Sequence, residues 1–335
     1  MYKVGMDVHK ASITGAIVDI KGNLHAKCKF KNSIGDMFKF VEGLPPDFTE
    51  VGMESGTYIY PLYDALVEKG FKVRVAHAKK LRRITQSAAK NDDKDAEDIA
   101  RQLLVRDFPE SFILNKEQRE NRELIRMRIK IVQEQTRTKN RIRMFLARFN
   151  LKIKSRSPYT KVGITELKEL ELPTYAKRSL EILIRELLFV KKEIKQIDEQ
   201  LGQIEETLPE AKLLRTIPSI GQFSALTFLV ELAEWKRFEN VKNLSAYIGM
   251  IPKMSGSANK MYFGRMRFDG NKSIRYAFNR AAENAIKMKR SEFYEYFTRL
   301  YPKKKRRTAV AAVAHKMLRV CYGVLKSREP YKPGS

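Results

Sequence analysis

Residues 1–10 read MYKVGMDVHK, and this stretch decides how the rest of the chain is interpreted. Residues 2–6 have the composition of a short buried strand, which delivers Asp7 at its end. Aspartate is depleted in strands, so a carboxylate at this point needs a reason. A turn or a helix N-cap is the ordinary explanation, because aspartate is common in turns. The remaining sequence decides between that explanation and a functional carboxylate.

The composition indicates a nucleic-acid-binding protein. The 335 residues suffice for two or three domains, and 43% of them are hydrophobic, enough for substantial cores. Lysine and arginine number 66 against 39 acidic residues, a net charge of +27 that is typical of nucleic-acid binders. An anionic membrane surface is the weaker alternative. The sequence shows no amphipathic lipid anchor, signal peptide or apolar run of transmembrane length, so no membrane partner is expected.

Cysteine usage fits a reducing compartment. Cys28 and Cys321 are the two cysteines, and neither has a cysteine or histidine at zinc-ligand spacing. Structural zinc and a disulfide framework are therefore not expected, and a cytoplasmic, nucleoid-associated prokaryotic protein fits.

The first hundred residues predict an α/β domain. Strands are expected at 2–6, 11–20, 24–30, 49–53 and 71–76, with helices at 33–44, 58–69 and 87–105, the last interrupted by the polar stretch 90–95. Ser33 is suited to cap the first of these helices. The order predicts a mixed sheet with the first strand in its centre, the ribonuclease-H-like arrangement. In that arrangement the first and fourth strands end side by side.

Four carboxylates collect at these element ends. Asp7 ends the first strand and Glu54 follows the fourth, while Asp92 and Asp95 begin the last helix three residues apart. A solvated acidic first turn would also explain the two helix aspartates. Four neighbouring acids repel one another unless cations neutralise them, and oxygen ligands suit Mg²⁺ or Mn²⁺. Two such ions about 4 Å apart can hold both oxygens of a phosphodiester displacement.

Two long helices are predicted in the middle of the chain. Residues 116–149 form a very basic helix that we expect to contact phosphate rather than only water. Its candidate contacts are Arg126, Lys130, Arg137 and Arg141. After a linker at 151–173, apolar residues from Leu183 to Leu208 alternate at spacings of four and three, a strict heptad seam. The seam must pair with the first long helix, a second subunit or both.

The last third contains two candidate phosphate-binding stretches. Residues 216–221, before an apolar helix at 222–232, resemble the turn of a helix-hairpin-helix, in which amides near Gly221 hold a phosphate. An ordinary capped turn is the alternative. Residues 252–260 are small and polar, and predict either a plain surface loop or a flexible loop that offers a serine hydroxyl to a phosphate. Nearby cations suited to the phosphorus oxygens are Lys260, Arg265, Arg267, Lys272 and Arg275.

Together these motifs resemble the DEDD transposases of the insertion-sequence-110 family, which are related to Piv-type DNA invertases. Three patterns carry the resemblance: GMDV at 5–8, MESG at 53–56 and KNDDKDA at 90–96, where Asn91 replaces the family's threonine. Further matches, which extend the similarity to nearly the whole chain, lie at 217–221, 247–252 and 270–271.

The resemblance implies three regions. They are a RuvC-like DEDD catalytic domain at 1–110, a helical coiled-coil region at 111–210 and a mainly helical transposase domain at 211–335. It further implies metal binding by the four carboxylates, a nucleophilic serine that joins covalently to DNA, and a structured non-coding bridge RNA that pairs with donor and target DNA. Since such a site combines two domains, we expect a homo-oligomer, a dimer or tetramer, held together by the coiled coil.

The serine itself departs from the family pattern, in which Ser-Gly lies five residues after a proline. Counting from Pro252 gives Ser257, but Ala258 follows it, whereas Ser255-Gly256 has the right dipeptide at the wrong offset. The downstream tyrosine and glycine fall in register only with Ser257, so we expect Ser257 to be the nucleophile.

Two other functions compete with this interpretation. One is a RuvC-like junction-resolving nuclease in which metal-activated water replaces the serine. The other is a non-catalytic RNA-binding protein built on the basic helices.

Overall fold

The structure is a computed structural model that describes residues 1–85, 92–105, 108–257, 260–266, 270–289 and 291–333. The chain divides into two compact units, Met1–Ile113 and Leu114–Ser335, which are described separately below.

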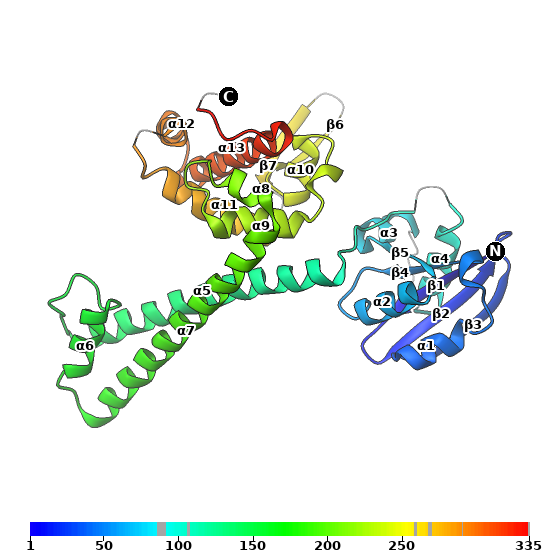
Figure 1. Ribbon diagram of the computed structural model, residues 1–335, viewed down its shortest axis with the longest axis horizontal. Helices are drawn as coiled ribbons and strands as arrows, with labels where there is room; N and C mark the ends of the chain where they lie inside the picture. The colour runs from blue at the N-terminus through cyan, green and yellow to red at the C-terminus, as the bar shows by residue number, and fades with distance from the viewer. Residues whose placement is uncertain (86–91, 106–107, 258–259, 267–269, 290, 334–335) are drawn as a thin grey trace. The chain divides into compact units, whose positions relative to one another are not determined.

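The first unit is built on a five-stranded sheet in the order β3-β2-β1-β4-β5 (Figure 1). Its strands are β1 (Tyr2–Val8), β2 (Ser12–Asp19), β3 (Leu24–Lys31), β4 (Thr49–Glu54) and β5 (Lys72–Ala76). β1, β2 and β3 form an antiparallel meander, while β1, β4 and β5 run parallel. The predicted central position of the first strand is confirmed, and the topology is consistent with a ribonuclease-H-like fold.

The helices of this unit follow the sequence-based prediction in part. They are α1 (Ile34–Phe40), α2 (Tyr60–Glu68), α3 (Ala78–Thr85) and α4 (Asp92–Gln102), with a short 3-10 helix η1 (Pro46–Phe48). The Ser33 hydroxyl accepts a hydrogen bond from the Asp36 amide and caps α1, as expected. Helix α3 was not predicted, and the helix predicted at 87–105 is shorter, with residues 86–91 outside the described residues.

Two glycines bring α4 directly onto the sheet. A Cβ atom at Gly5 of β1 would lie 2.0 Å from the carbonyl oxygen of Ala96, and one at Gly52 of β4 would lie 2.8 Å from Ile99 Cγ2. Because the helix backbone occupies the space of a side chain at Gly5, glycine is required there. Gly5 and Gly52 are paired across β1 and β4, and together they allow this helix to approach the sheet closely.

A long helical hairpin begins the second unit. It consists of α5 (Lys116–Arg148), α6 (Lys161–Glu169) and α7 (Thr174–Thr207), and Figure 1 shows α5 and α7 as long helices with α6 at their far end. Asn115 and Gln118 form a capping box that starts α5. The heptad seam of α7 packs on α5 of the same chain, so the first of the predicted partners is confirmed.

The segment 151–173 is not the bare linker that was expected. Helix α6 lies within it, and its Ile164 and Leu167 are buried in a cluster with Phe145 of α5 and Leu187 of α7. Short apolar helices of this kind gain their stability from packing, which explains why the local sequence did not indicate one.

The remaining helices pack around one core. They are α8 (Pro209–Leu214), α9 (Gln222–Leu232), α10 (Val241–Ile248), α11 (Lys272–Ala285), α12 (Glu292–Leu300) and α13 (Arg306–Ser327), with 3-10 helices η2 (Trp235–Arg237) and η3 (Tyr301–Lys303). By length and composition α13 could cross a membrane. However, 56% of that stretch is buried inside this unit, as expected of a core helix.

The prediction of a loop at 252–260 is wrong over most of this range. β6 (Pro252–Ser257) and β7 (Lys260–Met266) form an antiparallel hairpin, with Ser255 paired to Tyr262 and Ser257 to Lys260. The reason lies in the partner segment, because the two aromatic residues of KMYFGRM favour a strand, and this strand supplies the pairing that a small polar stretch lacks by itself.

Candidate active site

Two of the predicted carboxylates lie at the same edge of the first unit's sheet. β1 and β4 are parallel and pair Met6 with Met53, so the next residues, Asp7 and Glu54, reach the same edge together. Glu54 is the last residue of β4, where the strand gives way to the Ser55-Gly56 turn. The sequence-based expectation that the first and fourth strands end side by side is confirmed at this point.

Asp7 is held inside the sheet rather than at a solvated turn. The residue is 8% exposed and its neighbour across β2 is Thr14. The His9 ring atom Nε2 lies 2.8 Å from Asp7 Oδ2, which gives the carboxylate a hydrogen-bonded partner. Sequence reasoning did not single out His9. A signal was available, because His9 follows Asp7 by two positions, directly after the end of β1.

The start of α4 lies toward this edge. Gly5 in the middle of β1 contacts Ala96 and Ala100, whereas Gly22, in the turn that flanks the opposite end of β1, faces Arg101 and Leu104. Helix α4 therefore runs antiparallel to β1, with its first turn on the side of Asp7. Asp95 lies in that turn and is half-buried. The side chain of Asp92 lies outside the described residues.

Hard divalent cations fit this set of donors. Asp7, Glu54 and Asp95 offer only carboxylate oxygens, the ligands that Mg²⁺ and Mn²⁺ prefer. Among the side chains that the structure describes, no group of three or more His, Cys, Asp or Glu forms a ready cluster, and Asp92 is not among those side chains. The fit therefore rests on the shared edge and on the chemistry of the donors.

The candidate serine lies in the β6–β7 hairpin of the second unit. Ser257 ends β6 opposite Lys260, and Ser255 is paired with Tyr262. The side chains of these residues, and that of Arg265, lie outside the described part. The strand register thus places both serines in one short strand. The choice of Ser257 over Ser255 as the nucleophile stays a prediction.

Several predicted phosphate-binding arginines of α5 already have carboxylate partners. Arg126 donates two hydrogen bonds to Glu231, of 2.8 and 3.0 Å, and Arg141 donates to Glu186 at 2.9 Å. Arg137 pairs with Glu134 on its own helix. Lys130 is exposed. Arg137 and Arg141 also line a groove of about 710 Å³ with Arg148, where a phosphate would share the first two arginines with their carboxylate partners.

A buried carboxylate that was not predicted from the sequence connects α5 to the residue before α11 through hydrogen bonds. Glu231 of α9 has no exposed surface and accepts hydrogen bonds from Arg126 and from Asn271 Nδ2 at 2.8 Å. Burial disfavours its charged form, but the hydrogen bonds from Arg126 and Asn271 and the charge of Arg122 outweigh burial and hold the pKa of Glu231 below its ordinary value. The missed signal was a lone acid in the apolar run 222–232.

The predicted turn before α9 is present. Gly221 is the N-cap of α9, and a Cβ atom there would meet nothing within 4 Å, so the approach to the helix amides is open. Lys272 is the first residue of α11, beside the capping residue Asn271. Both positions suit phosphate contact, because helix N-termini and cations favour anions.

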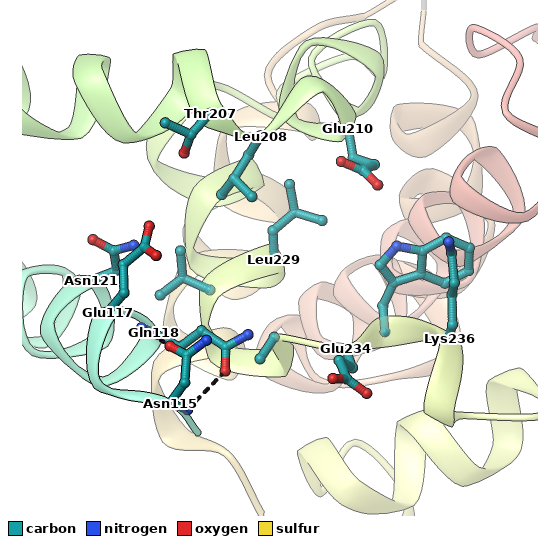
Figure 2. Close-up of a pocket in the computed structure, with 13 residues that line it drawn as sticks. Asn115, Glu117, Gln118, Asn121, Thr207, Leu208, Glu210, Leu229, Glu234 and Lys236 are labelled. Carbon is teal, nitrogen blue, oxygen red and sulfur yellow. Dashed lines mark hydrogen bonds between the residues drawn. The ribbon is translucent and has the colours of Figure 1, made fainter. Parts of the chain in front are cut away.

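A separate pocket at the root of the helical hairpin is unsuited to phosphate. Figure 2 shows its lining, which includes Glu117, Glu210, Glu234 and Lys236. The pocket has a volume of about 440 Å³. Three carboxylates against one ammonium group repel an anion. The phosphate contacts are therefore expected elsewhere in this unit.

Comparison with known proteins identifies the class of the chain as transposase. Residues 4–151 match a family described as the DEDD transposase of IS110, and residues 211–298 match one described as the transposase IS116/IS110/IS902 family. The chain belongs to the IS110/IS116/IS902 family of DEDD transposases, which is related to the Piv pilin invertases.

Individual relatives cover both units. The transposase for insertion sequence element IS1111A of Coxiella burnetii is 25% identical over 73% of this chain and 69% of its own length. The transposase for IS1328 of Yersinia enterocolitica is 23% identical over 96% of both chains. The pilin gene-inverting protein of Moraxella bovis is 28% identical over 41% of this chain and 45% of its own length.

Proposed function

We propose that this transposase cuts and rejoins DNA with a metal-bound carboxylate tetrad and a serine nucleophile. The observation that carries the proposal is the common edge reached by Asp7 and Glu54, toward which the first turn of α4 points. The tetrad is completed by Asp92 and Asp95.

The proposed reaction is a transesterification at phosphorus. The hydroxyl oxygen of Ser257 forms a bond to the phosphorus of a phosphodiester, one P–O bond to the sugar breaks, and the departing sugar oxygen takes up a proton. Strand exchange later reverses the step with a different sugar hydroxyl and releases the serine. The four carboxylates hold Mg²⁺ or Mn²⁺, whose chemistry when bound is to lower the pKa of an attacking hydroxyl and neutralise charge on phosphate oxygens.

Neighbouring cations would orient the DNA for this step. Lys260 and Arg265 lie in β7, across from the serine strand, and Lys272 begins α11. Guanidinium and ammonium groups stabilise negative charge that develops on phosphate oxygens. Gly221 would add backbone amide donors at the start of α9.

The proposed partners are donor and target DNA and a structured bridge RNA of the element. The net charge of +27 and the groove that contains Arg137, Arg141 and Arg148 support binding of phosphate backbones. Base pairing by the RNA would supply sequence specificity, so the protein needs only to recognise backbone and shape.

A covalent adduct tests the serine directly. Wild-type protein, labelled DNA, the element's RNA and Mg²⁺ are incubated, denatured and analysed for a protein–DNA species that resists denaturation. We expect an adduct in the wild type, its loss in Ser257→Ala and its persistence in the matched control Ser255→Ala. The reverse pattern moves the nucleophile to Ser255. Cleaved ends without any adduct would instead favour a nuclease that uses metal-activated water.

A further inference from the structure

A groove in the second unit combines cations with aromatic rings and contains none of the residues predicted to bind nucleic acid. It runs along one face of α13, between α12 and the segment that follows α13, and has a volume of about 640 Å³. Ligand sites that hold small molecules or single nucleotide units typically enclose about 300–1,000 Å³. The lining residues that matter here are Tyr296, Arg299, Arg319, Gly323 and Tyr331.

Two arginines of this groove are available to an anion. Both Arg299 and Arg319 are exposed, and within the described part of the chain no carboxylate forms an ion pair with either. The guanidinium carbon of Arg299 lies 5.4 Å from the ring centroid of Tyr296, within the range of a cation–π contact. The lysines of the groove differ, because Lys316 pairs with Glu292 at 3.4 Å and Lys332 with Glu329 at 2.8 Å.

The aromatic wall is held in place by packing and hydrogen bonds. The Tyr331 ring stacks on Phe293 with centroids 6.5 Å apart, and its backbone amide donates to Thr216 Oγ1 at 2.9 Å. His315, on the same face of α13, adds no charge near neutral pH, because burial and the charge of Arg319 lower its pKa. Among the described residues, the groove thus offers two guanidinium groups without a carboxylate partner, beside two tyrosines that pack against the core.

We propose that this groove binds an unpaired nucleotide segment of a nucleic-acid strand, with phosphate on Arg299 and Arg319 and a base against Tyr296 and Tyr331. Arginine beside aromatic rings is the recurring chemistry of single-strand recognition, since every base has a face that can stack. An acidic peptide would use the arginines but not the aromatic wall. The proposal rests on the protein's handling of nucleic acid and is independent of the serine chemistry.

Gly323 offers a way to fill the groove without disturbing the fold. It lies on the groove face of α13, and a Cβ atom there would meet nothing within 4 Å. Gly323→Trp therefore places an indole in the groove. Gly323→Ala is the matched control, because it leaves the groove open and favours the helix.

The test measures binding of full-length protein to fluorescein-labelled 12-nucleotide RNA, DNA of the same sequence and a DNA duplex by fluorescence anisotropy. We expect Gly323→Trp to weaken single-strand binding about tenfold relative to Gly323→Ala and to leave duplex binding unchanged. Arg319→Gln should do likewise and lower the salt slope by about one. Its control is Lys326→Gln, on the same helix outside the groove.

Each outcome decides the proposal. Loss for both single strands supports the shared chemistry, and loss for RNA alone assigns the groove to the guide. Equal single-strand binding by Gly323→Trp and Gly323→Ala overturns the proposal, as does competition by a glutamate-rich peptide that matches an oligonucleotide. If Gly323→Trp does not fold, Arg299→Gln combined with Arg319→Gln gives the same decision. Failure of the covalent adduct would leave these results unchanged, so the two hypotheses fail separately.

Discussion

Asp7 is the residue at which sequence and structure agree most closely. Asp7 is 8% exposed and lies at the end of the central strand, beside Glu54. This position does not fit the alternative interpretation of Asp7 as a turn or N-cap aspartate. The position of Asp7 beside Glu54 could be predicted from the strand order alone, because parallel strands end at the same edge of a sheet. Glu231 could not be placed in this way, since its partners come from α5 and from Asn271, distant in sequence.

Asp7→Asn should abolish DNA cleavage and leave the fold intact, because an amide is a poor ligand for a hard cation. We expect a loss of at least about a hundredfold, larger than that typical of residues that only support a ligand. Cleavage assays with Mg²⁺, alongside circular dichroism, measure both effects. Asp36→Asn, in α1, is the control. Wild-type cleavage by Asp7→Asn would remove this residue from the metal site.

Glu231→Gln should lower the free energy of unfolding by about 2 kcal/mol, because it weakens the charge-assisted hydrogen bonds that the fully buried carboxylate accepts from the partly exposed Arg126 and removes the charge partner of Arg122. Glu186→Gln, which breaks the more exposed pair with Arg141, should cost less than about 1 kcal/mol. Urea unfolding of both variants gives the comparison. Equal, small losses would show that the Glu231 cluster contributes little.

Glu231 should also make the stability of the protein depend on pH. The pKa of Glu231 is lower in the folded than in the unfolded protein, so the unfolded state binds more protons in acid. The stabilisation is present above the unfolded-state pKa of about 4.3 and is lost as pH falls through the folded-state value. Glu231→Gln should therefore flatten this part of the stability curve.

At the scale of elements, periodic patterns were predictable and pairings were not. Alternation of polar and apolar residues predicts the strands of the first unit. Ser33 predicts the capped start of α1, and an apolar run predicts the range of α9. Helix α6 and the β6–β7 hairpin were missed because both depend on partners: a cluster with α5 and α7 for one, and a neighbouring strand for the other. The local sequence of each is too short or too polar to indicate its structure.

The position of α4 gives a prediction at this scale. In Gly5→Ala the new methyl group meets backbone atoms of Ala96 and Ala100, so the helix must move off the sheet. We expect a loss of about 1–3 kcal/mol in stability together with impaired cleavage, since Asp95 moves with the helix. Gly35→Ala in α1, where a Cβ meets nothing within 4 Å, should be neutral or stabilising. Full cleavage activity in Gly5→Ala would argue against a metal site at this edge.

At the scale of the whole molecule, the seam of α7 packs on α5 within one chain, so contact with a second copy would involve other residues. Ile182 and Phe189 are 48% and 64% exposed and lie seven residues apart, with Tyr175 a further seven before them. A heptad spacing of exposed apolar residues suits contact with a second copy. Oligomerisation itself is a prediction from the sequence.

Ile182→Asp combined with Phe189→Asp should therefore lower the mass of the assembly, because charges on this stripe oppose helix contact. Light scattering measures the mass, and Arg185→Gln, between the two positions, serves as the control. An unchanged mass in the double variant would exclude this stripe as the contact.

The helical hairpin leaves and re-enters the same core. Ile125 and Ile129 of α5 and Ile197 and Leu201 of α7 are buried together at its root, while the tip has a core of its own around Phe145 and Ile164. One heptad added to each long helix between these two cores would carry the tip outward by about 10 Å and change neither end. The length of this arm can thus be altered independently of the rest of the protein.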